Sequence, residues 1–211
     1  MFGDAMISFQ EFAMREPLPI GTIQVAVLEF MEGRSDGVLY GALAVNAYVK
    51  EPRFTQDVDI ASTRAKDLAE EIREFLHQRF HIAVRIRTAK EGLGYRVYQV
   101  RKPENRHLVD VRQVELLPPS QKVRNILVLT PPELAAAKVL AIAGRSKGKL
   151  AKALTDKADL VRLLQTFPEL QVEKGPVADC LRAGGASKAA WAVWSEMVKE
   201  PIEPDDDWDG Y

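Results

Sequence analysis

The segment from Gly41 to Ile60 constrains the fold of this 211-residue chain more than any other part of its sequence. Asp57 and Asp59 lie near its end, separated by Val58, in a stretch with the composition of a β-strand. Residues two apart on a strand point to the same face, so the two carboxylates would project side by side. Such a pair is repulsive unless a cation neutralises it. The segment therefore predicts a strand at an open cleft, with a hard divalent ion such as Mg²⁺ as the expected cation.

A third aspartate, Asp110, interrupts the strand-like segment HLVDVRQVEL, with Val109 and Val111 on the opposite face. Aspartate is disfavoured within strands, so three such residues in one small sheet are hard to explain as surface decoration. Two-metal sites need carboxylates on neighbouring strands around one cleft, and this set predicts phosphoryl or nucleotidyl transfer. For each aspartate taken singly, an exposed strand position is the alternative.

Gly41 lies between a predicted strand, Val38–Tyr40, and a predicted helix, Ala42–Val49. A residue without Cβ lets the backbone approach a phosphate, and a helix N-terminus offers unpaired N–H groups with a partial positive charge. A purely geometric need of the turn is the alternative. The position of this glycine upstream of the paired acids favours the phosphate interpretation.

The order of the predicted elements indicates an α/β (α+β) fold with a mixed β-sheet and flanking helices. Alternating apolar residues between 82 and 114 predict three consecutive antiparallel strands, and Ile126–Leu129 predicts a last strand. From Thr130 onwards the sequence is helical, and Thr-Pro-Pro-Glu predicts an N-cap with a capping box. We therefore expect a catalytic domain over 1–129, a helical domain over 130–200 and an acidic, flexible tail over 201–211.

The formal net charge of −1 conceals two regions of opposite charge. Segment 144–157 carries five basic residues against one acid, whereas 195–211 carries seven acids against Lys199 alone. The basic segment could attract a polyanion, although a solvated helix face is the commoner explanation. The single cysteine, Cys180, excludes an intramolecular disulfide and suits a reducing compartment. No apolar run approaches a membrane span, so we expect a cytoplasmic protein without membrane association.

The glycine, the spacer, the paired aspartates and the later strand aspartate together resemble the DNA polymerase β-like nucleotidyltransferase superfamily. The string Pro52-Arg-Phe-Thr-Gln-Asp57-Val-Asp59 is similar to its AbiEii-type branch, which includes toxins of toxin-antitoxin systems. The second half agrees, because Lys138 follows a Pro-Glu helix start and Asp156-x-x-Asp159-Leu160 lies on a later predicted helix. The chain departs from the family at Ala42, where a second glycine or a serine is common.

The resemblance implies a metal-dependent nucleotidyltransferase that moves an NMP from an NTP to an acceptor hydroxyl. Asp57, Asp59 and Asp110 would form the catalytic set and bind two Mg²⁺ ions, or Mn²⁺ in their place. The nucleotide-binding residues that it implies are Gly41, Ala42, Arg53, Thr55, Lys138 and Asp159.

The acceptor stays open at this point. An RNA or tRNA 3′ end is favoured by the basic segment and by the excess of eight bases over three acids between Arg85 and Arg112. A protein hydroxyl or a small molecule is the alternative, and a cognate antitoxin would be the partner of a toxin. We expect Arg145, Lys147, Lys149 and Lys152 of this segment to affect RNA binding but hardly NTP binding, because they lie beyond the helix that carries Lys138.

A function of a different class is also open. The chain could be a catalytically inactive module that keeps the fold to bind nucleotide or a partner protein. Ala42 supports this alternative, and the intact aspartates Asp57, Asp59 and Asp110 oppose it.

Overall fold

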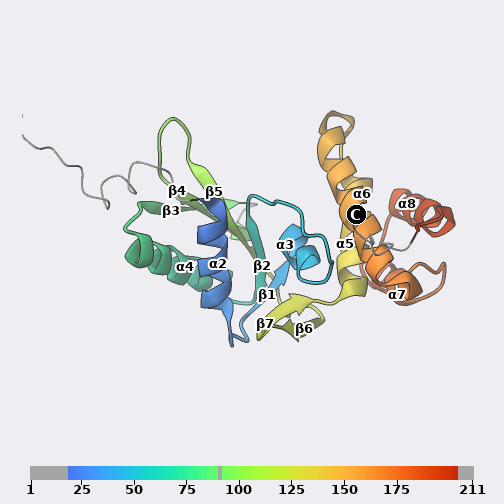
Figure 1. Cartoon of the computed structure of the whole chain (residues 1–211), viewed down its shortest axis with the longest axis horizontal. Coiled ribbons are helices and arrows are strands. Elements are labelled where there is room, and N and C mark those ends of the chain that lie inside the picture. The colour runs from blue at the N-terminus through green and yellow to red at the C-terminus, as the bar shows by residue number, and fades with distance from the viewer. Residues whose placement is uncertain (1–18, 90–91, 204–211) are drawn as a thin grey trace, which may run out of the picture.

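The computed structural model describes residues 19–89 and 92–203 of the chain. Its centre is a seven-stranded mixed sheet with strand order β3-β4-β5-β2-β1-β7-β6, and helices flank the sheet (Figure 1). The predicted α/β fold with a mixed sheet and a helical C-terminal part is confirmed. The predicted acidic tail lies outside the described residues from 204 onwards.

The strands are β1 (Gly37–Tyr40), β2 (Val58–Ser62), β3 (Val84–Ala89), β4 (Gly94–Gln99), β5 (Arg106–Gln113), β6 (Ser120–Val123) and β7 (Ile126–Leu129). The α-helices are α2 (Ile20–Met31), α3 (Gly41–Asn46), α4 (Ala65–Phe80), α5 (Pro131–Gly144), α6 (Leu150–Thr166), α7 (Pro176–Ala183) and α8 (Lys188–Lys199). Short 3₁₀ turns, η2 (Lys147–Lys149) and η3 (Pro168–Leu170), flank α6.

The sheet combines parallel and antiparallel pairs around β2. Strand β2 is antiparallel to β1 and parallel to β5, and β1 is parallel to β7. Strands β3, β4 and β5 form the predicted antiparallel meander. The edge strand β6, which pairs with β7, was not predicted, because its sequence Ser-Gln-Lys-Val lacks an apolar alternation.

Helix α4 owes its position to the helical spacing of Leu68, Ile72 and Leu76, all of which are fully buried. Together with α2 it covers the apolar face of the sheet, where Val97 and Val109 are also buried. Fully burying a side chain of this size contributes about 1.5–3 kcal/mol, so this layer stabilises the strands that carry the aspartates.

The C-terminal helices lie beside the sheet, and α5 packs against α6, α7 and α8 (Figure 1). Trp194 of α8 is only 1% exposed, as expected for a packing anchor. Thr130 takes the N-cap position of α5 with Pro131 at the first helical residue, but its side chain makes no capping hydrogen bond, so the capping-box prediction is wrong. The predicted domain boundary falls between β7 and α5.

Two further sequence predictions need correction. The helix expected over Ala42–Val49 is the shorter α3, and Asp57 immediately precedes β2 instead of lying within it. No helix in the described ranges is long and apolar enough to cross a lipid bilayer.

Candidate active site

A cavity of about 700 Å³ opens between the sheet and helices α5 and α6. The fold brings together five separate segments of the chain to line this cavity. All the predicted site residues except Asp159 line it, namely Asp57, Asp59, Asp110, Gly41, Ala42, Arg53, Thr55 and Lys138. Asp159 lies behind the wall and pairs with two of these residues.

The parallel pairing of β2 and β5 puts Asp59 directly opposite Asp110. Their neighbours Val58, Ile60, Val109 and Val111 are fully buried on the other face of the sheet, so both carboxylates face the cavity. Asp57 lies two residues before Asp59 and lines the same cavity. Three carboxylates therefore share one space, as the spacing predicts.

Asp59 is the electrostatic focus of this group. Burial raises its pKa to about 7, and the negative charges of Asp57 and Asp110 add to this effect. Asp59 forms no ion pair with any described residue. The pKa of Tyr40, its cross-strand neighbour, is also raised, first by burial and then by the Asp59 charge. The fold thus keeps a carboxylate at a place where its charge is uncompensated.

Gly41 meets two separate requirements at the end of β1. Its φ of +74° lies in the left-handed region that side chains disfavour. A Cβ at this position would also collide with the carboxylate of Asp59. The glycine is therefore needed to let the turn approach Asp59, and its predicted contact with a phosphate stays a prediction.

Asp57 and Asp110 each face a basic side chain. His107 Nδ1 lies 3.2 Å from Asp57 Oδ2, and this contact lowers the pKa of Asp57. Arg96 Nε donates to Asp110 Oδ2 over 3.2 Å. The sequence did not reveal either partner. His107 would face away from Asp110 in a regular strand, but a bulge in the β4–β5 pairing after Val97 moves it to the same face.

The donor set suits a hard divalent cation, because it consists of carboxylate oxygens grouped around one cavity. No group of three or more His, Cys, Asp and Glu side chains converges tightly enough to hold a metal ion in the described parts of the chain. Asp57 and Asp110 are directed to His107 and Arg96 instead. The residue types therefore fit a metal site, and these two carboxylates would have to turn from their basic partners to bind the ion.

A chain of alternating charges joins the loop before β2 to helices α5 and α6. Arg53 binds Asp159 through two hydrogen bonds of 2.5 and 2.7 Å. Lys138 Nζ donates to Asp159 over 2.7 Å and to Asp156 over 3.0 Å. Arg145 also binds Asp156, with its closest contact at 2.7 Å. Burial opposes ionisation of Asp159, but the bonds from Arg53 and Lys138 lower its pKa overall. Arg53 and Lys138 are thus already neutralised within the protein.

Further cations line the cavity beyond the predicted set, namely Arg112, Arg145 and Lys152. Arg145 and Lys152 belong to the basic segment 144–157, which we expected to have little effect on NTP binding because it follows the helix of Lys138. Both nevertheless line the cavity, because α6 folds back against α5 and returns the segment to it. Their effect on NTP binding stays a prediction.

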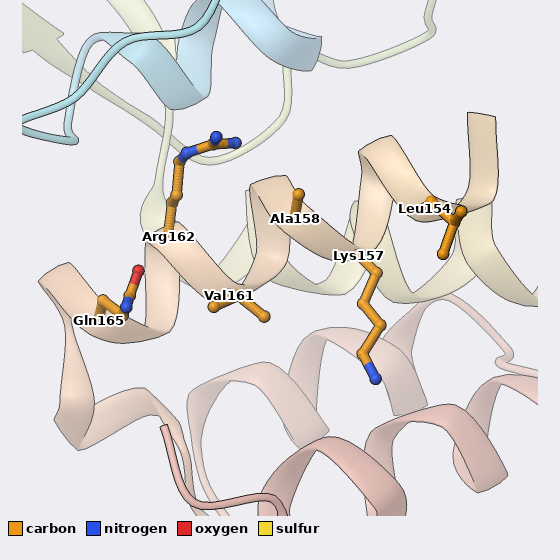
Figure 2. Close-up of a pocket in the computed structure, with 6 residues that line it drawn as sticks. All are labelled: Leu154, Lys157, Ala158, Val161, Arg162 and Gln165. Carbon is orange, nitrogen blue, oxygen red and sulfur yellow. The ribbon is translucent and has the colours of Figure 1, made fainter. Parts of the chain in front are cut away.

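A second hollow of about 380 Å³ lies along α6 (Figure 2). Lys157 and Val161 point toward the C-terminal helices there, while Arg162 points to the opposite side of α6 (Figure 2). Its lining contains no carboxylate, histidine or thiol. The larger cavity with the aspartates is therefore the candidate active site.

Comparison with known proteins agrees with this geometry. A family model described as "Nucleotidyl transferase AbiEii toxin, Type IV TA system" matches residues 26–209. No curated protein sequence matches the chain significantly.

Two solved structures share the fold at low sequence identity. The Megavirus polyadenylate synthase superposes with a TM-score of 0.54 at 13% identity, over 80% of this chain and 39% of that one. A candidate nucleotidyltransferase from H. pylori superposes with a TM-score of 0.51 at 11% identity, over 85% of this chain and 91% of that one. The chain therefore spans less than half of the Megavirus protein. The family match covers most of the chain, which belongs to the AbiEii family of nucleotidyl transferase toxins.

Proposed function

We propose that this nucleotidyltransferase is metal-dependent and moves an NMP from an NTP to the 3′-hydroxyl of an RNA, with tRNA as the favoured class. It would act as the toxin of a toxin-antitoxin system and have a cognate antitoxin as its partner. In this proposal residues 1–129 form the catalytic domain and 130–200 the helical domain that closes the cavity from the other side.

One observation carries the proposal: Asp59 and Asp110 lie opposite each other on parallel strands and face a cavity that Asp57 also lines. These three side chains would hold two Mg²⁺ ions, or Mn²⁺ in their place. Bound divalent ions would neutralise the charge that develops on the transferring phosphoryl group. Asp110 would also accept the proton of the attacking hydroxyl, a role that its position beside the cavity allows.

Further cations of the cavity support binding of a triphosphate. Arg112, Arg145 and Lys152 line the same space as the three aspartates. Arginine binds phosphate oxygens through two parallel hydrogen bonds, and lysine binds them as a point charge. Gly41, Ala42 and Thr55 would contribute contacts at the turn, while Arg53, Lys138 and Asp159 would fix the position of α5 and α6.

A labelling experiment tests the proposal. The full chain is incubated with Mg²⁺, each α-labelled NTP in turn and total RNA, and labelled products are separated from free nucleotide. We expect one NTP to label RNA and Asp59→Asn to abolish the labelling. The matched control is Asp67→Asn on α4, because this side chain is 67% exposed and far from the cavity.

The outcomes separate the alternatives. Label on protein or on a small molecule would show that the acceptor is not RNA. Tight NTP binding without transfer to any acceptor would support a nucleotide-binding module and contradict the proposed activity. Labelling that persists in Asp59→Asn would remove Asp59 from the catalytic set.

A further inference from the structure

One face of the three-stranded meander carries arginines without a covering helix in the described part of the chain. Helices α4 and α2 pack against the other face, where Ile86, Val97 and Val109 point. Strands alternate, so the residues between these core positions point to the open side. This arginine face consists of Arg85 and Arg87 on β3, Arg96 on β4 and Arg112 on β5.

The strand register places the side chains of the arginine face in two rows that run across the strands toward the active site. The first row ends at Asp110. Arg87 lies opposite Arg96, and Arg96 lies opposite Asp110. Asp110 is the only acidic residue within these three strands. Like charges directly opposite each other in a sheet are destabilising, so neighbouring arginines need an anion. Among the arginines of this face, only Arg96 has a carboxylate partner within the described residues, at 3.2 Å.

The second row adds aromatic rings to these charges. Arg85 lies opposite Tyr98, and Tyr98 lies opposite His107. The rings of Tyr98 and His107 are 5.0 Å apart at 35°, and the Arg87 guanidinium lies 5.6 Å from the Tyr98 ring centroid. His107 in turn contacts Asp57. A half-buried aromatic pair therefore continues from the arginine face to the aspartates.

Arg85 supports the same interpretation through an unsatisfied donor. Its Nε is buried and has no hydrogen-bond partner among the described residues. An unpartnered polar atom of this kind is costly. Because the Arg85 side chain as a whole is only half-buried, it can turn toward a phosphate oxygen on this face, which could accept the bond, whereas an apolar partner could not.

We propose that the arginine face is the binding platform for the single-stranded end of the acceptor RNA. Phosphates would bind Arg85, Arg87 and Arg96, and one base would stack on Tyr98, so that the terminal hydroxyl reaches Asp110. Basic grooves combined with aromatic side chains are the general means of binding single strands. The inference rests on the proposed function and deepens it by assigning the acceptor a place on the enzyme.

The test uses the full chain and a fluorescent single-stranded RNA oligonucleotide in a salt series. The double variant R85Q/R87Q removes two charges from the arginine face without touching the aspartates. We expect about tenfold weaker binding and a salt dependence of log K flatter by about 1.4, because each lost single-strand phosphate contact reduces the slope by about 0.7. NTP affinity should stay as in the wild type.

The matched control is R73Q/R79Q, which removes the same charge from α4 on the opposite side of the sheet. Arg73 pairs with Glu70 there, and Arg79 pairs with Glu29. This variant should show the wild-type salt slope. A second pair of variants tests stacking: Tyr98→Leu should weaken RNA binding at least about fivefold, and Tyr98→Phe should bind as the wild type does.

Two results would overturn the assignment. A wild type that fails to bind RNA would exclude RNA from this face, and so would an R85Q/R87Q variant that loses no more affinity than the control. If RNA is still labelled from NTP in that second case, the proposed function stands and only the location is wrong. If the wild type transfers label to no acceptor, the proposed function itself fails, together with this inference.

Discussion

Asp36 and Asp59 lie at opposite ends of the β1–β2 strand pair and have opposite electrostatic surroundings. Asp36 is bound by Arg34 at 2.7 Å and by Arg64 at 2.8 Å. The bond from Arg34 is the main cause that lowers the pKa of Asp36 to about 2. Asp59 has no such partner among the described residues, and its pKa rises to about 7.

The difference shows which acid serves the fold and which one serves chemistry. Both are aspartates at a single sheet, so residue type does not explain the contrast. The protein supplies guanidinium groups to Asp36, whereas Asp59 is more deeply buried and is also crowded by Asp57 and Asp110. A group held in an unfavourable protonation state within a cavity is a mark of a functional site. Replacing each acid by asparagine and comparing activity and stability tests this distinction.

The largest effect is expected on activity. Asp59→Asn should lower nucleotidyl transfer at least about a hundredfold, because it removes the central carboxylate of the site. Asp36→Asn should retain wild-type turnover per folded molecule. Initial rates with labelled NTP, corrected for the folded fraction, provide the comparison. Equal rates for the two variants would remove the distinction between the two acids.

The second effect is a loss of stability at Asp159. Its negative charge is neutralised by Arg53 and Lys138, and its side chain is only 1% exposed. Asp159→Asn should lower the free energy of unfolding by about 3 kcal/mol, because Arg53 and Lys138 lose their shared buried partner. Urea unfolding measures the change. Asp179→Asn is the control, since its pair with Arg182 is exposed and should contribute less than about 1 kcal/mol. A similar small change in both variants would show that the charge chain does not hold the helices.

A smaller loss is expected for Asp36→Asn, about 2 kcal/mol at pH 7. The pKa of Asp36 is lowered by folding, so its contribution is complete above about pH 4 and disappears as the pH falls through about 2. Wild type and variant should therefore converge in stability in strong acid. Urea unfolding across this pH range measures the convergence, and a gap that persists below about pH 2 would contradict the assigned pKa.

The last effect has the opposite sign, a gain in stability. The pKa of Asp59 is raised by folding, so ionisation destabilises the wild type as the pH rises from about 4 to about 7. Asp59→Asn cannot ionise, and it should be more stable than the wild type by about 4 kcal/mol at pH 8 without divalent ions. The two proteins should be equally stable near pH 4. Melting temperatures of both proteins at pH 4 and pH 8 show whether the variant gains or loses stability. A variant that melts below the wild type at pH 8 would contradict the prediction.

Much of the fold could be predicted because the local patterns agree with the packing. Helix α4 follows from its apolar spacing, and the meander follows from strand alternation. The edge strand β6 could not be predicted, since its four residues are mainly polar. The shared face of Asp59 and Asp110 was predicted correctly, because both have buried valine neighbours.

Other parts of the site depend on contacts that spacing does not reveal. The pair of Arg53 and Asp159 joins residues 106 positions apart, and only the family resemblance brought both into the predicted set. His107 was not predicted as a site residue, because the bulge in the β4–β5 pairing puts its side chain on the other face of the sheet than regular strand alternation would. The position of Arg145 and Lys152 in the cavity was not predicted, because a sequence does not show how α6 folds back on α5. Local residue spacing thus predicts helices, strands and the faces on which side chains lie. Ion pairs between residues far apart in the sequence become visible only in the structure.

The most direct test of the account is a pH titration of the Asp59 carboxyl carbon by NMR in the presence and absence of Mg²⁺. An uncompensated site acid should titrate near pH 7 without divalent ions, as burial and its two acidic neighbours require. Bound Mg²⁺ should keep it ionised to well below that value, because an adjacent cation favours the carboxylate. A midpoint near pH 4 under both conditions would contradict the account, since Asp59 would then be an ordinary solvated aspartate.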